Sequence, residues 1–493
     1  MFGRSHITFM GKVIDSLIDA GHEVTVLGPV LQSKLGSYGT KKAKTPEARV
    51  FEEEQHADMV SQIWISPNFL GLLRLMQKSR VVWHAGCNAT IHSTEIIDQL
   101  RAEKFDAAFS QPLDLCGFGI FHHLGIKNVA ITFSISAFEN SFAITGNPAF
   151  PSYVPSQLGT TTDVMTFWER VMNFVPHFVI GHVMTWRVGA TDAILREKYG
   201  QDFPSLGEIL PQVSLAFLNS DPLIEFPRPI THNIIDIGGI SVSGGHQTLN
   251  STWDAIFSLR PKTVLLSFGT VAKSYLMPEA YKKTIRETFK KFPNVTFIWK
   301  YENPEDRISA GIDNIIESTF VPQNDMLYDP RLSLFITHCG QGSTTEATTA
   351  GVPLIVIPVM GDQRRNSMVI KRIGTGIVLN KEDLEESDEL EKALKEILSN
   401  PEYAEKAAKI GQMIRDKPFS PKELLVKNME FLATYGPLKQ LSHHGRNLNF
   451  FQYYLIDVFA FLAFILLAVL SVIFFVLRAI FRCLSRSIKV KKE

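Results

Sequence analysis

The chain contains 493 residues, which is long enough for two domains with substantial hydrophobic cores. Its 50 Lys and Arg residues balance its 50 Asp and Glu residues, so the net charge is zero. Because nucleic-acid-binding proteins carry a basic excess, we expect no nucleic-acid partner.

The amino-terminal segment begins with a helical pattern and continues into a strand pattern. Apolar residues recur at helical spacing over residues 10–18, and Gly21 follows as a helix-ending residue. Residues 24–27 then predict a strand. A helix that feeds a strand is half of a βαβ unit, in which another strand precedes the helix. The sequence offers no such strand before residue 10, so we expect the amino terminus to be incomplete and to lack a signal peptide.

The middle of the chain contains further strand and helix patterns. Residues 106–109 and 128–133 predict buried strands, and residues 167–199 form a long amphipathic stretch. A Pro- and Gly-rich connection at 222–245 follows, and we place the domain boundary there.

Beyond this connection, strand and helix patterns alternate again. A helix is predicted at 278–292, and strands are predicted at 263–267, 295–300, 332–337 and 354–357. Such alternation indicates a parallel sheet with helices on both faces, so the fold class is α/β.

Residues 458–477 are uniformly apolar and carry no charge. Twenty helical residues span the roughly 30 Å hydrocarbon core of a bilayer, although a buried core helix is the alternative. Aromatic residues at 450–454 precede the run and basic residues follow it, which places the tail in the cytosol and the body in a lumen. Three glycosylation sequons, at Asn88, Asn250 and Asn294, agree weakly with a lumenal body.

The four cysteines show neither a CxxC pair nor metal-ligand spacing, so we expect no metal site. A chain of this length does not need disulfides as structural staples.

The loop after the predicted strand 332–337 is the first candidate site. It reads His-Cys-Gly-Gln-Gly-Ser-Thr-Thr-Glu over residues 338–346, a glycine-bearing turn that leads into a helix. Free backbone N–H groups at a helix start attract a phosphate. A capping box formed by Ser343 and Glu346 would explain the same residues without any ligand. The loop does not match the Walker P-loop.

The run from 320 to 366 resembles the signature of the UDP-glycosyltransferase family. It contains Phe-Val-Pro-Gln at 320–323, Thr-His-x-Gly-x-x-Ser-x-x-Glu at 337–346, Gly-x-Pro at 351–353 and Asp-Gln-x-x-Asn at 362–366. Ser-Phe-Gly-Thr at 267–270, Ile-Gly-Gly at 237–239, Gly-His at 21–22 and the C-terminal anchor are also similar. The resemblance covers most of the chain and implies two facing Rossmann-like domains of GT-B type, with the donor in the second.

The resemblance also implies roles for individual residues. Phe320 would lie beside the uracil, where most relatives carry Trp, Gln323 would contact the base or ribose, and Glu346 would contact the ribose. The remaining donor-binding positions are Gly269, Thr270, His338, Gly340 and Ser343 around the diphosphate, and Asp362 and Gln363 at the sugar hydroxyls. Cys339 replaces a usual glycine, and its side chain either crowds the phosphate or points away.

The first domain would supply the general base. Ser5-His6-x-x-Phe9-Met10 matches the family's histidine motif, and His6 is expected just before a helix whose dipole keeps the imidazole neutral. The family places an acidic residue at position 111 to orient this histidine, whereas this chain has Gln111. Asp114 either takes that role or is a solvated loop residue.

The prediction is therefore an inverting transferase that moves glucose or glucuronic acid from a UDP-sugar to a hydroxyl of a small lipophilic acceptor. The alternative is a catalytically impaired paralogue that binds nucleotide sugar or lipophilic ligands, or partners active family members. UDP-sugar is a co-substrate and no cofactor is expected. The expected partners are the donor, the acceptor, the membrane and, for an oligomer, family members.

The predicted parts are an acceptor domain at 1–221, a linker at 222–245, a donor domain at 246–440, a transmembrane helix at 455–477 and a basic cytosolic tail at 478–493. Lys489 and Lys491 occupy the fifth and third positions from the carboxyl end. This resembles the dilysine retrieval signal of endoplasmic-reticulum membrane proteins, although a stop-transfer flank is also basic. We predict a single-pass type I protein of that membrane with a lumenal body.

Overall fold

The computed structural model describes residues 4–30, 39–49, 64, 84–112, 115–136, 149–242, 246–385 and 388–490. The chain divides into two compact units, Met1–Leu441 and Ser442–Glu493. The first unit contains two parallel sheets of more than two strands, and the second unit contains the apolar helix.

The first of these sheets has the strand order β3-β4-β5-β6. Its two central strands are buried on both faces: in β4 (Val129–Phe133), Ile131 and Phe133 enter one core, while Ala130 enters the other. This alternation explains why parallel strands read as continuous apolar runs. The strands are β3 Ala108–Ser110, β4 Val129–Phe133, β5 Leu215–Leu218 and β6 Ile234–Asp236, and the helices of this part are α1 Arg4–Asp19, α4 Thr94–Glu103, α5 Cys116–His123, α7 Phe167–Tyr199 and α8 Leu206–Ile209.

The second sheet has the strand order β12-β11-β10-β7-β8-β9, and all its pairs are parallel. Val264 and Leu266 of β7 face one core, whereas Leu265 faces the other. The strands are β7 Lys262–Ser267, β8 Val295–Lys300, β9 Ile315–Ser318, β10 Leu332–Thr337, β11 Leu354–Val356 and β12 Gly376–Val378. The helices are α9 Ser251–Phe257, α10 Glu279–Lys290, α11 Gln323–Leu327, α12 Gln341–Ala350, α13 Gln363–Ile373, α14 Glu389–Ser399 and α15 Pro401–Arg415.

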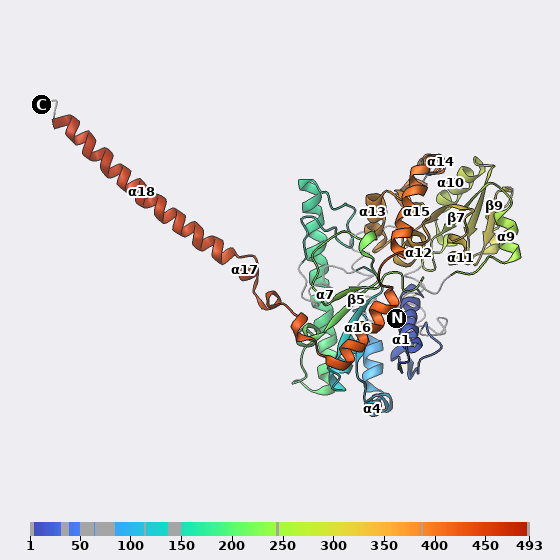
Figure 1. Cartoon of the computed structure of the whole chain (residues 1–493), viewed down its shortest axis with the longest axis horizontal. Coiled ribbons are helices and arrows are strands. Elements are labelled where there is room, and N and C mark those ends of the chain that lie inside the picture. The colour runs from blue at the N-terminus through green and yellow to red at the C-terminus, as the bar shows by residue number, and fades with distance from the viewer. Residues whose placement is uncertain are drawn as a thin grey trace. The chain divides into compact units, whose positions relative to one another are not determined.

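Helix α16, Pro421–Tyr435, follows the second sheet in the chain but packs against elements of the first sheet. It contacts α1 and β6, and Figure 1 shows it close to α1. Leu425, Val426, Met429 and Leu432 of α16 share a buried cluster with Phe9 of α1 and its neighbours. The carboxyl end of the first unit therefore completes the core of the first sheet. The predicted domain limits stay predictions.

One strand expectation about the first half needs correction. The strand predicted at 24–27 is wrong, because Thr25 makes only an isolated bridge with Lys44. The nearby strands are β1 Gly28–Val30 and β2 Glu47–Arg49, which pair with each other in a separate small sheet. The predicted linker at 222–245 contains β6, whose three residues pair with β5 at the edge of the first sheet.

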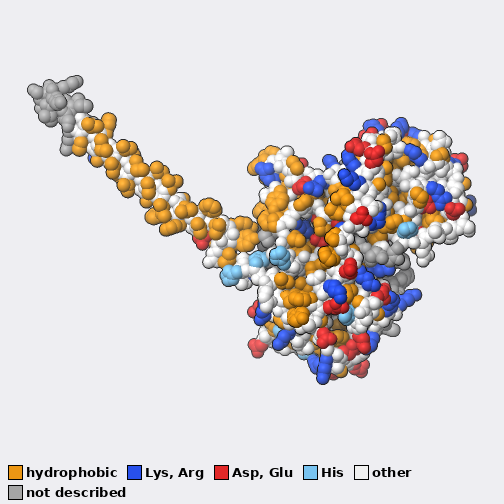
Figure 2. Space-filling view, in the orientation of Figure 1, with side chains coloured by type: hydrophobic (Ala, Val, Ile, Leu, Met, Phe, Trp, Pro, Cys, Tyr) orange, Lys and Arg blue, Asp and Glu red, His pale blue; other side chains and the backbone are white. Residues whose placement is uncertain are grey.

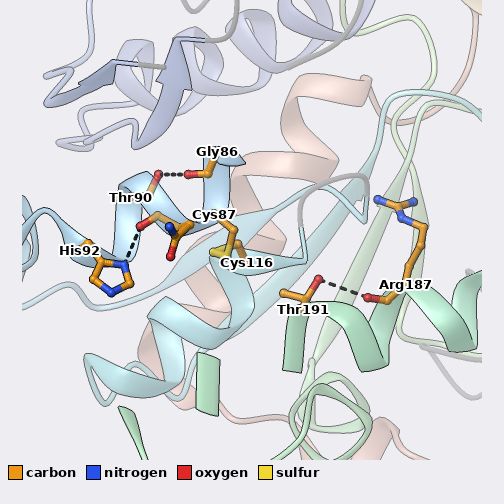
Figure 3. Close-up of a disulfide and its surroundings, with 8 residues drawn as sticks. Gly86, Cys87, Thr90, His92, Cys116, Arg187 and Thr191 are labelled. Atoms are coloured by element: carbon orange, nitrogen blue, oxygen red, sulfur yellow. Dashed lines mark hydrogen bonds between the residues drawn. A yellow bond between two sulfur atoms is a disulfide. The ribbon is translucent and has the colours of Figure 1, made fainter. Parts of the chain in front are cut away.

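A disulfide links Cys87 to Cys116, which the length argument did not predict. Figure 3 shows that it joins the helical segment at residues 84–92 to the start of α5. Cys339 and Cys483 are free cysteines. Because structural disulfides form in oxidising compartments, this bond agrees with a lumenal or extracellular location of the body.

The second unit is mainly helical. Short α17, Phe450–Tyr453, precedes α18, Ile456–Val490, which Figure 1 shows as one long helix. Within the described residues, Ile456–Leu484 is the helix that is long and apolar enough to cross a membrane. The helix extends well beyond the predicted limit at 477.

Candidate active site

The second sheet reverses its strand order between β7 and β10. From β7 the chain adds β8 and β9 on one side, and then β10, β11 and β12 on the other. Ligands of such sheets bind at the carboxyl ends of the strands beside this reversal. Gly269 lies two residues beyond β7, and His338 follows β10 directly. Two of the predicted donor residues therefore lie at the place that the topology favours.

The His338 ring packs between two glycines. A Cβ atom on Gly269 would lie 2.7 Å from His338 Cε1, and a Cβ atom on Gly340 would lie 2.6 Å from His338 Nε2. Gly269 also has a φ of +78°, which favours glycine. Both positions thus need glycine to leave room for the imidazole, and Thr270 continues the same loop as an exposed residue.

Burial lowers the pKa of His338 to about 4, and the charge of Lys300 acts in the same direction. The imidazole is therefore neutral at pH 7 and can donate one N–H to an anion. Its Nδ1 lies 3.4 Å from Thr337 Oγ1.

Lys300, at the end of β8, is a site residue that the sequence argument missed. Its Nζ donates to the carbonyl of Gly269 at 2.5 Å and to Glu302 Oε1 at 3.1 Å. It brings a positive charge to the loop that carries Gly269. The rule that places ligands at the carboxyl ends of strands would have identified it, since Lys300 is the last residue of a predicted strand.

Cys339 points away from the loop surface. It is fully buried, its Sγ lies 3.4 Å from Thr344 Oγ1, and burial raises the pKa of its thiol to about 12. Its φ of +64° lies in the left-handed region. A glycine adopts this conformation without steric cost, which explains why the resembling family uses glycine at this position.

Helix α12 begins without the predicted capping box. Its N-cap is Gly340, and no side chain caps it. Ser343 and Glu346 instead meet Gln323, whose Nε2 donates to Glu346 Oε2 at 2.5 Å and to Ser343 Oγ at 3.3 Å. Burial raises the pKa of Glu346. The capping-box interpretation of Ser343 and Glu346 is therefore wrong, and three predicted donor residues form one polar cluster.

Phe320 lies on the loop between β9 and α11 and exposes 69% of its surface. Ser318 Oγ donates to the Phe320 carbonyl at 2.6 Å and so fixes the backbone of this loop. An exposed aromatic ring three residues before Gln323 is suited to stack on a planar base.

Asp362 and Gln363 lie at the start of α13. Asn366 Nδ2 donates to Asp362 Oδ2 at 3.0 Å and to the Cys339 carbonyl at 3.1 Å, which ties α13 to the loop after β10. Burial raises the pKa of Asp362. Gln363 Oε1 accepts from the N–H groups of Val359 and Met360, so its amide N–H groups are the part left to contact a ligand.

His6 lies in the first turn of α1, not before the helix as predicted, because the helix begins at Arg4. Its Nδ1 contacts Ser134 Oγ just after β4. Burial lowers the pKa of His6 to about 4, whereas a hydrogen bond with Gln111 opposes this shift. The imidazole is neutral at pH 7 as expected, but burial is the main cause.

Gln111 is buried, and within the described residues its amide Nε2 has no hydrogen-bond partner, so the contact with His6 falls to its Oε1. Asp114, the other residue predicted to orient His6, lies outside the described residues. The sequence argument missed Ser134, because its position is set by the end of a strand about 130 residues away from His6.

A short chain of hydrogen bonds connects the His6 region to α12. Asn219, beyond β5, donates through Nδ2 to the Ser134 carbonyl at 2.9 Å. Gln341, in the first turn of α12, donates through Nε2 to the Asn219 carbonyl at 2.8 Å. The two predicted halves of the site are thus joined through His6, Ser134, Asn219 and Gln341. No cluster of metal-ligating side chains occurs among the described residues.

Comparison with known proteins agrees with this geometry. A family model described as "UDP-glucoronosyl and UDP-glucosyl transferase" matches residues 2–493. The protein ugt-47 of Caenorhabditis briggsae is 31% identical over 483 residues, covering 96% of this chain and 90% of that protein. UDP-glucuronosyltransferase 1A3 of Homo sapiens is 27% identical over 496 residues, covering 99% and 92%.

Solved structures show the same fold. Os79 of O. sativa, in complex with U2F and trichothecene, has a TM-score of 0.58 at 15% identity and covers 88% of this chain and 98% of its own. LpCGTa in complex with UDP has a TM-score of 0.55 at 16% identity, with 88% and 97% covered. These neighbours are GT-B glycosyltransferases, which confirms the predicted fold class.

Proposed function

Because the chain belongs to the UDP-glucoronosyl and UDP-glucosyl transferase family and is a UDP-glycosyltransferase, we propose that it transfers glucose or glucuronic acid to a hydroxyl of a small lipophilic acceptor. The observation that carries the proposal is the packing of His338 between Gly269 and Gly340 at the strand-order reversal. The neutral imidazole, the open start of α12 and Lys300 offer donors and positive charge to a diphosphate.

The donor contacts follow from the same cluster. The Phe320 ring stacks on the uracil, Glu346 accepts from the ribose hydroxyls, and Gln323 lies between them. Asp362 and the amide N–H groups of Gln363 bind the sugar hydroxyls at the start of α13. In this assignment each hydrogen-bonding group has the chemistry that its partner on a UDP-sugar requires.

His6 acts as the general base. The mechanism requires the tautomer with its proton on Nδ1, in which Nδ1–H donates to Ser134 Oγ. Nε2 then keeps a lone pair and takes the proton of the acceptor hydroxyl. The acceptor oxygen bonds to the anomeric carbon from the side opposite the phosphate, the carbon–oxygen bond to UDP breaks, and the configuration inverts. The negative charge that develops on UDP faces His338, Lys300 and the start of α12.

The location proposed is the endoplasmic-reticulum membrane, with a lumenal body and a cytosolic tail. The apolar helix α18 and the relatives are consistent with a membrane-anchored protein. The disulfide between Cys87 and Cys116 supports an oxidising compartment for the body. The three sequon asparagines are exposed and therefore accessible to glycosylation; they are Asn88, Asn250 and Asn294.

Turnover tests the proposal. The purified chain is incubated with UDP-glucose or UDP-glucuronic acid and a panel of simple phenols, and the glycoside and its anomeric configuration are measured. Products of inverted configuration with one of the two donors support it. Binding of UDP by calorimetry without product from either donor would favour the impaired paralogue, for which Gln111 in place of the family's acidic residue is the motivating feature.

A further inference from the structure

Trp64 lies in a hydrophobic core of the second sheet, although the chain before and after it belongs to the first sheet. Val26 precedes it and Cys87 follows it, and both are buried in the cores that cover the first sheet. Trp64 exposes only 2% of its surface and belongs instead to the cluster that contains Phe268 and Tyr281. The first half of the chain therefore contributes a residue to a core of the second half.

The Trp64 indole packs edge-on against two aromatic rings. Its centroid lies 5.0 Å from that of Phe268, at an interplanar angle of 78°, and 6.5 Å from that of Tyr281, at 74°. Edge-to-face pairs at such separations are a preferred arrangement of aromatic rings. Phe268 immediately precedes Gly269, so Trp64 contacts the start of the segment that follows β7. We call residues 268–273 the β7 loop.

The indole N–H reaches the other end of the same loop. Trp64 Nε1 donates to the Lys273 carbonyl at 2.9 Å. The Trp64 carbonyl in turn accepts from Lys381 Nζ at 3.0 Å, and Lys381 is only 4% exposed. Because a buried ammonium needs an acceptor, this bond holds the backbone of Trp64 against the second half while the indole holds the β7 loop.

Other hydrogen bonds of the β7 loop come from the second half itself. Lys300 Nζ donates to the Gly269 carbonyl at 2.5 Å, near the start of the loop. Glu302 Oε2 accepts at 2.8 Å from the N–H of the residue that directly follows the loop. Trp64 adds contacts from the first half at both ends. Gly269 and Thr270, the proposed diphosphate contacts of this loop, lie between those ends.

The chain offers an internal comparison in Trp299, which belongs to the same cluster and is fully buried. Among the residues that the structure describes, its Nε1 has no hydrogen-bond partner. Trp299 therefore fills volume in the core, whereas Trp64 fills volume and also binds the β7 loop through its N–H.

We propose that Trp64 is a positioning residue of the donor site. It holds the β7 loop in the conformation in which Gly269 and Thr270 meet the diphosphate. In this way the first half of the chain contributes to donor affinity without touching the donor. The inference rests on the proposed donor assignment of these two residues.

Binding of UDP and of uridine to the full chain in detergent tests the inference. Detergent is needed because α18 carries hydrophobic side chains along its exposed surface (Figure 2). Uridine has the uracil and ribose of UDP but no phosphate, so the ratio of the two affinities isolates the diphosphate contacts. UDP is measured by calorimetry, and uridine is measured as a competitor of UDP.

Trp64→Phe keeps an aromatic ring in the core and removes the N–H that binds the Lys273 carbonyl. We expect it to weaken UDP binding by about fivefold, the effect of one hydrogen bond, and to leave uridine binding unchanged. Trp299→Phe is the matched control, because it makes the same change in the same core but removes an N–H without a partner among the described residues. It should keep both affinities, even where it lowers the free energy of unfolding.

A second variant reaches the same contact through the backbone. Lys381→Met removes the donor to the Trp64 carbonyl but leaves the indole in the chain, and it should also weaken UDP binding without weakening uridine binding. Unchanged UDP affinity of Trp64→Phe, or an equal loss for UDP and uridine, would overturn the inference, because Trp64 would then only stabilise the fold. If the unchanged chain binds UDP no more tightly than uridine, the proposed diphosphate site is itself wrong and the inference is overturned with it.

Discussion

Arg365 and Glu225 form a buried ion pair that joins the start of α13 to the segment before β6. Arg365 Nη1 lies 3.0 Å from Glu225 Oε2, and Nη2 lies 2.5 Å from Oε1. The same guanidinium donates to Ser136 Oγ at 3.2 Å and to the Pro155 carbonyl at 3.3 Å. Because Arg365 follows Asp362 by three residues, it holds the proposed sugar-binding end of α13 against residues of the first half.

Loss of this pair should destabilise the fold. Arg365→Ala leaves Glu225 buried without its partner, and breaking such a pair costs about 3–5 kcal/mol. The free energy of unfolding is measured by denaturant titration. The control is Arg372→Ala, which removes a more exposed pair with Asp163 and should cost no more than about 1 kcal/mol. Equal effects of the two substitutions would contradict the structural role of Arg365.

His338→Ala should weaken UDP binding by more than about tenfold, since a hydrogen bond to a charged group contributes ~1.5–3 kcal/mol. Calorimetry with UDP measures this directly. Cys339→Gly is the matched control, because the Cys339 side chain points into the core and glycine suits its positive φ. We expect that variant to keep its UDP affinity. Unchanged affinity of His338→Ala would refute the donor assignment.

His6→Ala should lower kcat by about 10² or more while UDP binding stays intact, as expected for loss of a general base. Ser134→Ala should cost about fivefold, the equivalent of one hydrogen bond worth ~1 kcal/mol, and Ser134→Thr should restore most of the rate. Steady-state kinetics with a phenol acceptor measures both. An active His6→Ala variant would remove His6 from the mechanism.

The pH dependence of kcat/KM tests the partner of His6. The pKa of His6 is about 4, so the unchanged enzyme should lose its base only as the pH falls toward that value. In Gln111→Glu, a carboxylate stabilises the imidazolium and raises this pKa, so the acid limb should move to higher pH. A stronger base should also raise the rate at pH 7, unless Asp114 already supplies the charge. An unmoved acid limb would show that position 111 does not act on His6.

Replacement of Lys489 and Lys491 by Ser should release the protein from the endoplasmic reticulum when it is expressed in animal cells behind a cleavable signal sequence. The tail keeps its arginines in this variant, so the membrane orientation is preserved. Lys492→Ser alters a lysine outside the third and fifth positions from the end and should leave the location unchanged. Microscopy and glycan maturation report the outcome. Retention of the double variant would contradict the retrieval signal.

The sequence predicted those strands whose residues form a continuous, mostly apolar run. β8 and β10 were predicted to the residue, because Val295–Lys300 and Leu332–Thr337 are apolar runs that are buried on both faces. β6 was missed, since its three residues lie in a Pro- and Gly-rich segment and are defined by pairing with β5. The pattern of apolar residues cannot identify a strand that is defined only by its pairing with a neighbouring strand.

The candidate site likewise contains residues that a motif predicted and residues that only the fold identifies. The donor motif brought Gln323, Ser343 and Glu346 to attention, but their mutual hydrogen bonds depend on how α11 packs near α12. Ser134 and Lys300 carry no motif, and their roles come from the strand ends that place them. The disulfide between Cys87 and Cys116 likewise depends on two helices meeting in space.

The return of α16 to the first sheet limits how the protein can be divided. Leu425, Met429 and Leu432 cover apolar surface of α1 and β6, so a product that stops before residue 420 would leave that surface open to water. A chimaera that exchanges the first sheet and its helices between relatives must therefore carry residues 421–441 along with residues 1–242. The part of the chain that folds around the first sheet is discontinuous in the sequence.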